Sequence, residues 1–320
     1  MLLDRKTTYT VDYPKALEFV DTQMGILWLP DEIKVEKDVQ DILVNMTEAE
    51  RHGVITTLKL FTMYELIVGG EYWQNVVFNE FHHPADIQRM AKCFSFMELC
   101  VHAPFYSKIN EVLGLANDKF YTEYLDDRSL KERIDFLNSY TDANDHTLQE
   151  ALLALAFAEG VILYSNFAFL KHFQSQGKNK LGNIVRGINM SARDEALHSE
   201  ASAWLLRTLL SEYPAYDVPA LAEEARKMAK VVYEHECAII DKIFEKGKID
   251  DITDVQMKHF VESRINLVLS NLGFEKMFDV KYNPIGEWFY NGINNYIAND
   301  FFAGQGREYR RDWEEQAFTW

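Results

Sequence analysis

Three glutamates stand in segments where apolar residues would be expected. Glu65 lies in LFTMYELIVGG, Glu98 in CFSFMELCVHAPF and Glu159 in ALLALAFAEGVILYSNFAFL. No lysine or arginine lies within four positions of any of them, so a neighbour along the chain cannot neutralise them. Because an ionised carboxylate is costly to remove from water unless it is paired or binds a metal, these positions indicate metal ligands.

The order of glutamates and histidines repeats along the chain. A lone glutamate is followed, about one long helix later, by a glutamate and histidine pair, and this happens twice: Glu65, then Glu98 and His102; Glu159, then Glu195 and His198. Residues three or four apart share a helix face, so each pair can point two ligands into a bundle. Four carboxylates and two imidazoles form the ligand set of di-iron and di-manganese carboxylate bundles.

Each part of this pattern has a simpler explanation when it is taken alone. A single Glu-x-x-His on a helix is more often a surface pair or a satisfied core pair than a metal site. Glu159 alone could be a buried glutamate that is hydrogen-bonded to a tyrosine or an asparagine. The ordered repeat within apolar helices favours a dinuclear metal site over both explanations.

Long helices must carry these residues, and the sequence predicts them. Residues 105–213 contain no proline, the strongest helix breaker. Apolar residues follow helical spacing over seven segments, and no segment shows sustained period-2 alternation: 36–45, 48–80, 85–113, 145–174, 181–210, 219–247 and 253–272. We therefore expect an all-α fold, a single helical bundle in which the segments that are apolar on nearly every face lie at the centre.

Composition restricts the classes of partner and compartment. The formal net charge is −17, so nucleic acid would be repelled unless a basic patch existed, and none is visible. The three cysteines have no metal or redox spacing, and we expect a reducing, cytoplasmic setting. The apolar stretch 151–170 is similar to a membrane span, but it carries Glu159 at its centre, so we expect no membrane segment.

The ligand segments resemble a known family, the small, radical-generating subunit of class I ribonucleotide reductase. SARDEALHSE, residues 191–200, resembles its Arg-Asp-Glu-x-x-His signature, and Glu65 stands where many members have aspartate and some have glutamate. Tyr106 follows His102 by four positions, as the family's radical tyrosine does, and WLPDEI with Trp28 resembles its Trp-x-Pro-Glu-Glu element. The similarity touches most of residues 26–310 and implies a ferritin-like helical bundle.

The first ligand pair departs from the family's pattern. The family has Glu-x-x-His, whereas here three residues separate Glu98 from His102. On an ideal helix a spacing of four still leaves the two side chains within about 40° of one face. Pro104 can bend the helix beside the pair, and a π-helical bulge would absorb the extra residue.

The resemblance implies a function and a set of roles. The chain would be the small subunit of a ribonucleoside-diphosphate reductase, holding two metal ions, iron first, manganese or a mixed pair as alternatives. These would activate oxygen and leave a radical on Tyr106, which Trp28, Asp194 and His102 would pass outward through Tyr309. A catalytic large subunit, bound by the C-terminal tail, would then reduce ribonucleotides.

The resemblance also implies a homodimer and an organisation of the chain. We expect an N-terminal arm over residues 1–30, a ferritin-like domain over 31–285 and a tail over 286–320. The cytoplasm is the expected location, or the host cytoplasm if the source is viral.

Two other functions keep the same ligands. A related ferritin-like di-iron oxidase or monooxygenase would act directly on a small substrate and would not need Trp28, Tyr106 or the tail. A ferritin-like storage protein or a purely structural bundle would form no stable radical. A tyrosyl signal in electron paramagnetic resonance (EPR) spectra that is lost in Tyr106→Phe distinguishes the first reading from both alternatives.

Overall fold

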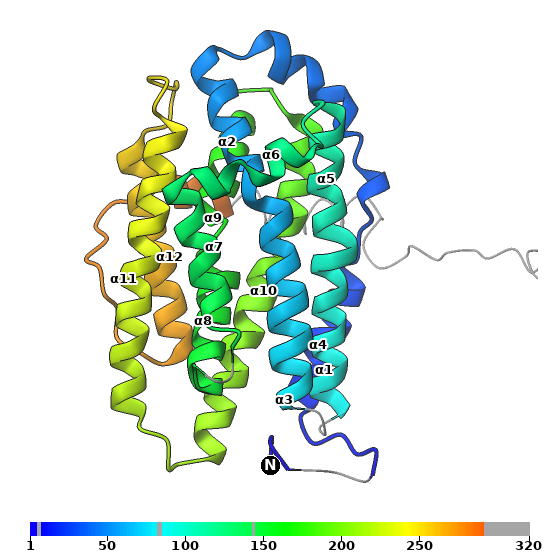
Figure 1. Cartoon of the computed structure of the whole chain (residues 1–320), viewed down its shortest axis with the longest axis vertical. Coiled ribbons are helices and arrows are strands. Elements are labelled where there is room, and N and C mark those ends of the chain that lie inside the picture. Colours follow the sequence, from blue (N-terminus) through cyan, green and yellow to red (C-terminus); the bar gives the residue numbers. More distant parts are fainter. Residues whose placement is uncertain (5–7, 82–84, 143–144, 291–320) are drawn as a thin grey trace, which may run out of the picture.

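The computed structural model describes residues 1–4, 8–81, 85–142 and 145–290. Figure 1 shows a tall bundle whose long helices run side by side along one axis. Its α-helices are α1 (Pro14–Gly25), α2 (Glu48–Leu66), α3 (Phe78–Glu80), α4 (Ala85–Met97), α5 (Ala103–Val112), α6 (Asp118–Thr122), α7 (Arg128–Ser139), α8 (Leu148–Gly160), α9 (Tyr164–Lys171), α10 (Gly182–Glu212), α11 (Val218–Ile243) and α12 (Asp254–Leu272). Within the described ranges β pairing is limited to one isolated bridge, so the all-α prediction is confirmed.

Short helical segments of other types connect or extend these helices. Three of them have π-helical geometry: η3 (Asp41–Asn45), η4 (Ile67–Val77) and η5 (Glu98–His102). Four are 3-10 turns: η1 (Pro30–Glu32), η2 (Val35–Asp38), η6 (Glu123–Asp126) and η7 (His172–Gln174). Through η4 and η5, α2 continues into α3 and α4 continues into α5, so each pair forms one long rod.

Local sequence signals define the ends of several helices. Thr47, Thr147 and Thr253 each begin a helix with a capping box, in which the threonine and the residue three positions later satisfy each other's backbone donors. Gly273 ends α12 with a φ of 87°, a left-handed conformation that glycine adopts without a side-chain clash. These signals explain why the predicted ranges 48–80 and 253–272 match the structure closely.

The centre of the bundle is formed by the rods α2–η4, α4–η5–α5, α8 and α10. Every residue of α8 from Ala151 to Gly160 is buried, and α8 packs along α10. The segment Leu148–Gln174 is long and apolar enough to cross a membrane by composition, but its most apolar window is entirely buried inside the bundle. Burial of this kind is what a central helix requires.

The sequence analysis did not predict helices at α1 or at α6 and α7. In α7 the apolar stripe is narrow, since only Leu130, Ile134 and Leu137 recur at helical spacing among mostly polar residues. In α1 the buried face is short and includes the polar Gln23. Packing against the bundle stabilises α1 and α7, because α1 packs on α4 and α7 packs on α11.

Three of the four ligand-bearing rods are distorted close to a ligand. The π-helical η4 begins two residues after Glu65, and η5 itself contains Glu98 and His102. A π-helical turn, which the sequence analysis gave as one way to absorb the extra residue, is therefore present at the first Glu–His pair. After Glu159, α8 ends at Gly160 and α9 restarts at Tyr164, with Leu163 in the left-handed region at a φ of 75°. Only α10 passes its ligands as a regular helix.

Candidate metal centre

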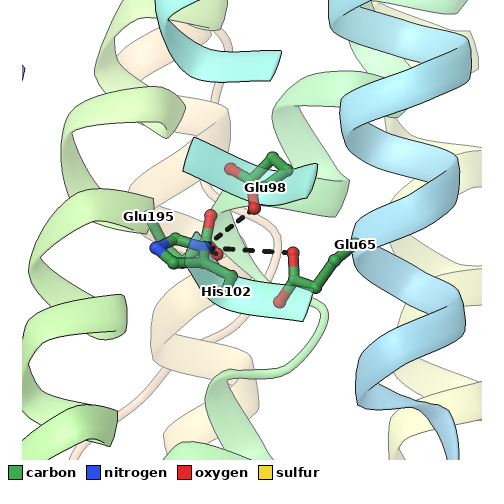
Figure 2. A group of neighbouring side chains, drawn as sticks. All are labelled: Glu65, Glu98, His102 and Glu195. Atoms are coloured by element: carbon green, nitrogen blue, oxygen red, sulfur yellow. Dashed lines mark hydrogen bonds and ion pairs between the residues drawn. The ribbon is translucent and has the colours of Figure 1, made fainter. Parts of the chain in front are cut away.

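The six predicted ligands converge at the centre of the bundle. Their side chains fall into two groups within metal-binding reach, and both groups contain Glu98 and Glu195: Glu65, Glu98, His102 and Glu195 in one; Glu98, Glu159, Glu195 and His198 in the other. Figure 2 shows the first group pointing toward one another from neighbouring rods. All six residues are buried, with at most 2% of any one exposed.

In the first group His102 faces three carboxylates. Its Nδ1 lies 2.8 Å from Glu98 Oε2, 3.3 Å from Glu195 Oε1 and 4.0 Å from Glu65 Oε2. The π-helical turn of η5 places Glu98 and His102 on the same side although they are four positions apart. One nitrogen and three oxygens therefore surround a common point.

The second group mirrors the first around His198. Its Nδ1 lies 2.6 Å from Glu98 Oε1, 3.6 Å from Glu195 Oε2 and 3.7 Å from Glu159 Oε2. Glu98 and Glu195 thus present one oxygen to each imidazole. Two carboxylates shared in this way can bridge a pair of metal ions.

A glycine allows η4 to approach the shared carboxylate. A Cβ on Gly69 would lie 2.7 Å from the Cβ of Glu98 and 2.9 Å from Leu99 Cγ, closer than carbon atoms can pack. A Cβ on the adjacent Gly70 would meet no atom within 4 Å. Glycine at position 69 is therefore a requirement of the site's packing, which the sequence analysis did not identify.

Most carboxylate oxygens of the site make no hydrogen bond within the chain. Both carboxylate oxygens of Glu65 and of Glu195, one of Glu98 and one of Glu159 are buried without a hydrogen bond. Buried polar atoms are normally paired, and unpaired carboxylate oxygens are especially costly. Two divalent cations would satisfy these oxygens, and oxygen with imidazole donors suits iron or manganese. The residues present therefore fit the predicted metal pair.

Burial and mutual repulsion dominate the protonation of the centre. Burial, and then the charges of Glu98 and Glu195, hold the pKa of Glu65 well above its usual range; burial and Glu195 do the same for Glu159. Burial would also raise the pKa of Glu98, but the two adjacent imidazoles hold it well below its usual value. Burial opposes the charged imidazolium of His102 and of His198, yet Glu98 raises the pKa of both. Protons thus balance the charge that a metal pair would balance instead.

Each imidazole is oriented from outside by a second hydrogen bond. His102 Nε2 lies 3.1 Å from Asp194 Oδ2, and the Trp28 indole Nε1 donates to that same oxygen at 2.8 Å. His198 Nε2 lies 3.1 Å from Gln23 Oε1. Outer partners of this kind fix the ring and direct the other nitrogen at the metal. The residues Trp28, Asp194 and His102, grouped by the resemblance, form one hydrogen-bonded chain, whereas Gln23 was not predicted.

Two aromatic residues complete the surroundings of the site. The Tyr106 hydroxyl is buried without a hydrogen bond, and burial, followed by the charge of Glu65, raises the pKa of Tyr106 well above its usual range. Its ring packs on Phe61, with the centroids 4.4 Å apart. The Trp73 indole N–H donates to Glu159 Oε1, a contact that the sequence analysis missed. Tyr309 lies outside the described residues.

Comparison with known proteins identifies the family. The sequence matches the family described as "Ribonucleotide reductase, small chain" over residues 5–284. It is 26% identical to the probable ribonucleoside-diphosphate reductase small subunit 048L of Invertebrate iridescent virus 3, covering 97% of this chain and 86% of that protein. It is 25% identical to the ribonucleoside-diphosphate reductase subunit beta of Bacillus subtilis, covering 92% and 88%.

Solved structures show the same fold. The ribonucleotide reductase R2 subunit from Clostridium botulinum superposes with a TM-score of 0.78 at 22% identity, over 88% of this chain and 89% of that one. Dimanganese(II)-NrdF of Streptococcus sanguinis superposes with a TM-score of 0.78 at 21% identity, over 91% and 99%. Since the family matches over most of its length, the chain belongs to the ribonucleotide reductase small-chain family.

Proposed function

We propose that this chain is the radical-generating small subunit of a ribonucleoside-diphosphate reductase. The observation that carries the proposal is the pair of ligand groups that share Glu98 and Glu195, in which six of the eight carboxylate oxygens make no hydrogen bond. Membership of the small-chain family supports it. The relatives that are about a quarter identical to this chain are named as reductase small or beta subunits, and the similarity covers most of their length.

The six residues would hold two metal ions. Glu65 and His102 would bind one ion and Glu159 and His198 the other, with the two shared carboxylates between them. We propose iron first, with manganese or a mixed pair as alternatives; a dimanganese relative of the same fold supports manganese as an occupant. When bound, such a pair supplies the oxidising power of activated oxygen, and the protein supplies a dry cavity and fixed ligands.

Tyr106 would store the oxidising equivalent. Its raised pKa keeps the phenol protonated at rest, so its oxidation must release the hydroxyl proton together with an electron. Glu65 is the carboxylate whose charge acts most strongly on Tyr106. In a loaded centre, where metal ions would balance the charge in place of protons, the ionised Glu65 would accept this proton. The apolar contact with Phe61 excludes water from the phenol ring.

Radical transfer would begin at the hydrogen-bonded chain from His102 through Asp194 to Trp28. Asp194 Oδ2 accepts from the indole and faces His102 Nε2, so one carboxylate can carry both links. We propose Tyr309 as the outer relay and residues 286–320 as the tail that binds a catalytic large subunit. That subunit would bind the ribonucleotide and reduce it.

The remaining predictions are proposals of the same kind. We propose a homodimer in the cytoplasm, or in the host cytoplasm for a viral source, with an N-terminal arm over residues 1–30 and a ferritin-like domain over 31–285. The net charge of −17 argues against nucleic acid as a partner.

One experiment tests the radical. The metal-free protein is loaded with Fe(II) or Mn(II), exposed to oxygen or an activated oxidant, and examined by EPR spectroscopy. We expect a tyrosyl signal that is lost in Tyr106→Phe and kept in Tyr72→Phe. Tyr72 is an equally buried control whose hydroxyl donates to Leu137 O at 2.6 Å. The absence of a tyrosyl signal under every metal loading would overturn the proposal.

A second measurement separates the reductase from a related oxidase or monooxygenase. With a catalytic large subunit added, the loaded protein should support the reduction of ribonucleoside diphosphates. Trp28→Phe should still form the tyrosyl radical but should lose nucleotide reduction, because it removes the indole N–H that donates to Asp194 and leaves the contact of Asp194 with His102. Retention of a small-substrate oxidation with no nucleotide reduction would favour the alternative.

A further inference from the structure

A buried arginine occupies the break between α8 and α9. The backbone N–H of Tyr164 donates to Val161 O at 3.1 Å, which leaves the Gly160 carbonyl without its regular helical donor. Arg264 of α12 fills this place: its Nε donates to Gly160 O at 2.9 Å. Gly160 directly follows the ligand Glu159, so Arg264 holds the peptide next to the metal centre.

The same guanidinium reaches the far end of the described chain. Its Nη1 donates to the Tyr290 hydroxyl at 3.1 Å, and its central carbon lies 3.5 Å from the ring centroid of Tyr164. Arg264 is 3% exposed, and no carboxylate of the described residues forms an ion pair with it. Its partners are therefore one carbonyl and one aromatic face, which flank the break between α8 and α9, and one phenol from the C-terminal segment.

A second buried cation holds the neighbouring residue. Lys171, at the end of α9, donates to Phe289 O at 2.9 Å, and its ammonium lies 4.0 Å from the centroid of the Phe289 ring. The Phe289 ring also packs on Tyr164, with the centroids 5.9 Å apart. Residues 289 and 290, the last two that the structure describes, are thus fastened to the helix that restarts after Glu159.

We propose that Arg264 couples occupancy of the metal centre to the anchoring of residues 285–290, where the C-terminal segment begins. This inference rests on the proposed metal pair at Glu159 and its neighbours. Binding fixes the Glu159 carboxylate and therefore the Gly160 carbonyl, and the planar, rigid guanidinium transmits that position to Tyr290. In a metal-loaded subunit residues 285–290 would then be held in place on the bundle, and in a metal-free subunit they would not. This difference would favour binding of metal-loaded subunits to the catalytic partner.

Hydrogen exchange measures this coupling without an activity assay. The amides of residues 285–290 are followed by mass spectrometry in the full chain, with and without Mn(II). Couplings between sites in proteins are commonly about 5- to 150-fold, so we expect these amides to exchange at least about 5-fold more slowly when Mn(II) is bound. In Arg264→Met the ratio should fall to about one.

A milder variant and a surface control make the test specific. Tyr290→Phe removes one oxygen and leaves the contact of Arg264 with Gly160, yet it should also abolish most of the Mn(II) effect. If Arg264→Met does not fold, Tyr290→Phe decides the matter. Arg226→Met, which removes an exposed arginine paired with Glu275, should keep the full effect.

Linkage supplies a second readout. Because coupling is reciprocal, Tyr290→Phe should weaken Mn(II) binding by no more than the factor by which Mn(II) slows exchange in the unchanged protein. Mn(II) binding with unchanged exchange at 285–290 would overturn the coupling alone. A protein that binds neither Mn(II) nor Fe(II) would overturn the proposed metal centre and the coupling together.

Discussion

The interior contains two clusters around buried carboxylates that differ in their hydrogen bonding: the six residues of the metal centre, and Glu236 with Arg133 and Ser165. At the metal centre six of the eight carboxylate oxygens make no hydrogen bond, and the cationic groups that face them are the imidazoles of His102 and His198. Glu236 of α11 is equally buried, at 0% exposed, but both of its oxygens accept hydrogen bonds. Arg133 of α7 donates to Oε1, and the Ser165 hydroxyl donates to Oε2 at 2.5 Å.

The difference shows that missing partners at the centre are not a general property of this core. At Glu236 the unpaired groups are donors, since Arg133 Nε and Nη1 lack hydrogen bonds. At the metal centre the unpaired groups are mostly carboxylate oxygens, which is the excess that cations would satisfy. The chain therefore satisfies both oxygens of a buried carboxylate with hydrogen bonds where only the fold is served, and leaves most carboxylate oxygens without hydrogen bonds where a ligand is to be held.

The sharpest test of the contrast is removal of the structural carboxylate. In Glu236→Gln the buried guanidinium of Arg133 loses its counter-charge, and breaking a buried ion pair costs about 3–5 kcal/mol. Urea denaturation of the metal-free protein measures the loss. The control Asp135→Asn breaks an exposed pair with Lys131 on the same α7 and should change the free energy of unfolding by no more than about 1 kcal/mol. Equal effects from the two variants would contradict the structural role of Glu236.

Lys171 represents a third case, a buried amine that forms no ion pair with a carboxylate within the part of the chain that the structure describes. Burial lowers its pKa from 10.5 to about 7. Between these two pH values the unfolded chain binds a proton that the folded chain does not, so stability rises with pH across that window, by at most about 1.4 kcal/mol per pH unit. Below pH 7 both states are protonated, and the cost of burying the charge is present in full.

Comparison of two lysine variants isolates this contribution. Lys171→Met should remove the rise in unfolding free energy between pH 7 and pH 10.5, while other titrating groups contribute equally to both proteins. Lys92→Met removes an exposed lysine that lies 4.2 Å from the Phe78 ring centroid, and it should leave the pH dependence unchanged. An unaltered slope in Lys171→Met would mean that the ammonium is not buried in solution.

The sequence allowed the buried carboxylates of the metal centre to be predicted, but not the buried Glu236. Glu98 and Glu159 could be recognised because each is an acidic residue inside an apolar run, and buried charge leaves that trace. Glu236 sits in VVYEHECAII, where flanking polar residues give the helix the pattern of an outer one, so its burial could not be inferred. Its partner Arg133 lies in α7, a helix whose narrow apolar stripe was not predicted.

The same limit applies to the surroundings of the ligands. The central helices were predicted because their apolar periodicity is local. The extra residue between Glu98 and His102 pointed to a local distortion, but the sequence left open whether a π-helical turn or a bend at Pro104 absorbs it. Gln23 and His198 are 175 positions apart, and their contact depends on the packing of α1. Trp73 and Glu159 are 86 positions apart. No spacing in the sequence encodes such pairs without a three-dimensional arrangement or the resemblance to a family.

A packing variant tests whether the ligand carboxylates depend on the close approach of η4 to η5. Gly69→Ala places a methyl group 2.7 Å from the Cβ of Glu98, so η4 and η5 must separate, at a cost of about 1–3 kcal/mol in the metal-free protein. Gly70→Ala, where a Cβ meets no atom within 4 Å, should instead stabilise the helix by about 0.5–1 kcal/mol. Both values come from urea denaturation, and Mn(II) binding should weaken in Gly69→Ala only.

The smallest expected effect, in Glu65→Gln, is the most informative because its sign should reverse with the metal. Both Glu65 oxygens lack hydrogen bonds, whereas a glutamine amide is neutral and can donate to the neighbouring carboxylates. Without metal, we expect the variant to gain about 0.5–2 kcal/mol, as is common when a strained functional site is relieved. Added Mn(II) stabilises each protein according to its affinity, so the unchanged protein should gain more and overtake the variant.

Denaturation curves across a range of Mn(II) concentrations should therefore cross. If Glu65→Gln is destabilised even without metal, as Glu236→Gln should be, then Glu65 supports the fold, and the contrast between the two carboxylate clusters fails. If the curves cross, Glu65 lowers the free energy of unfolding of the metal-free protein, and metal binding offsets this loss. That result would distinguish a ligand from a structural carboxylate without measuring any catalytic activity.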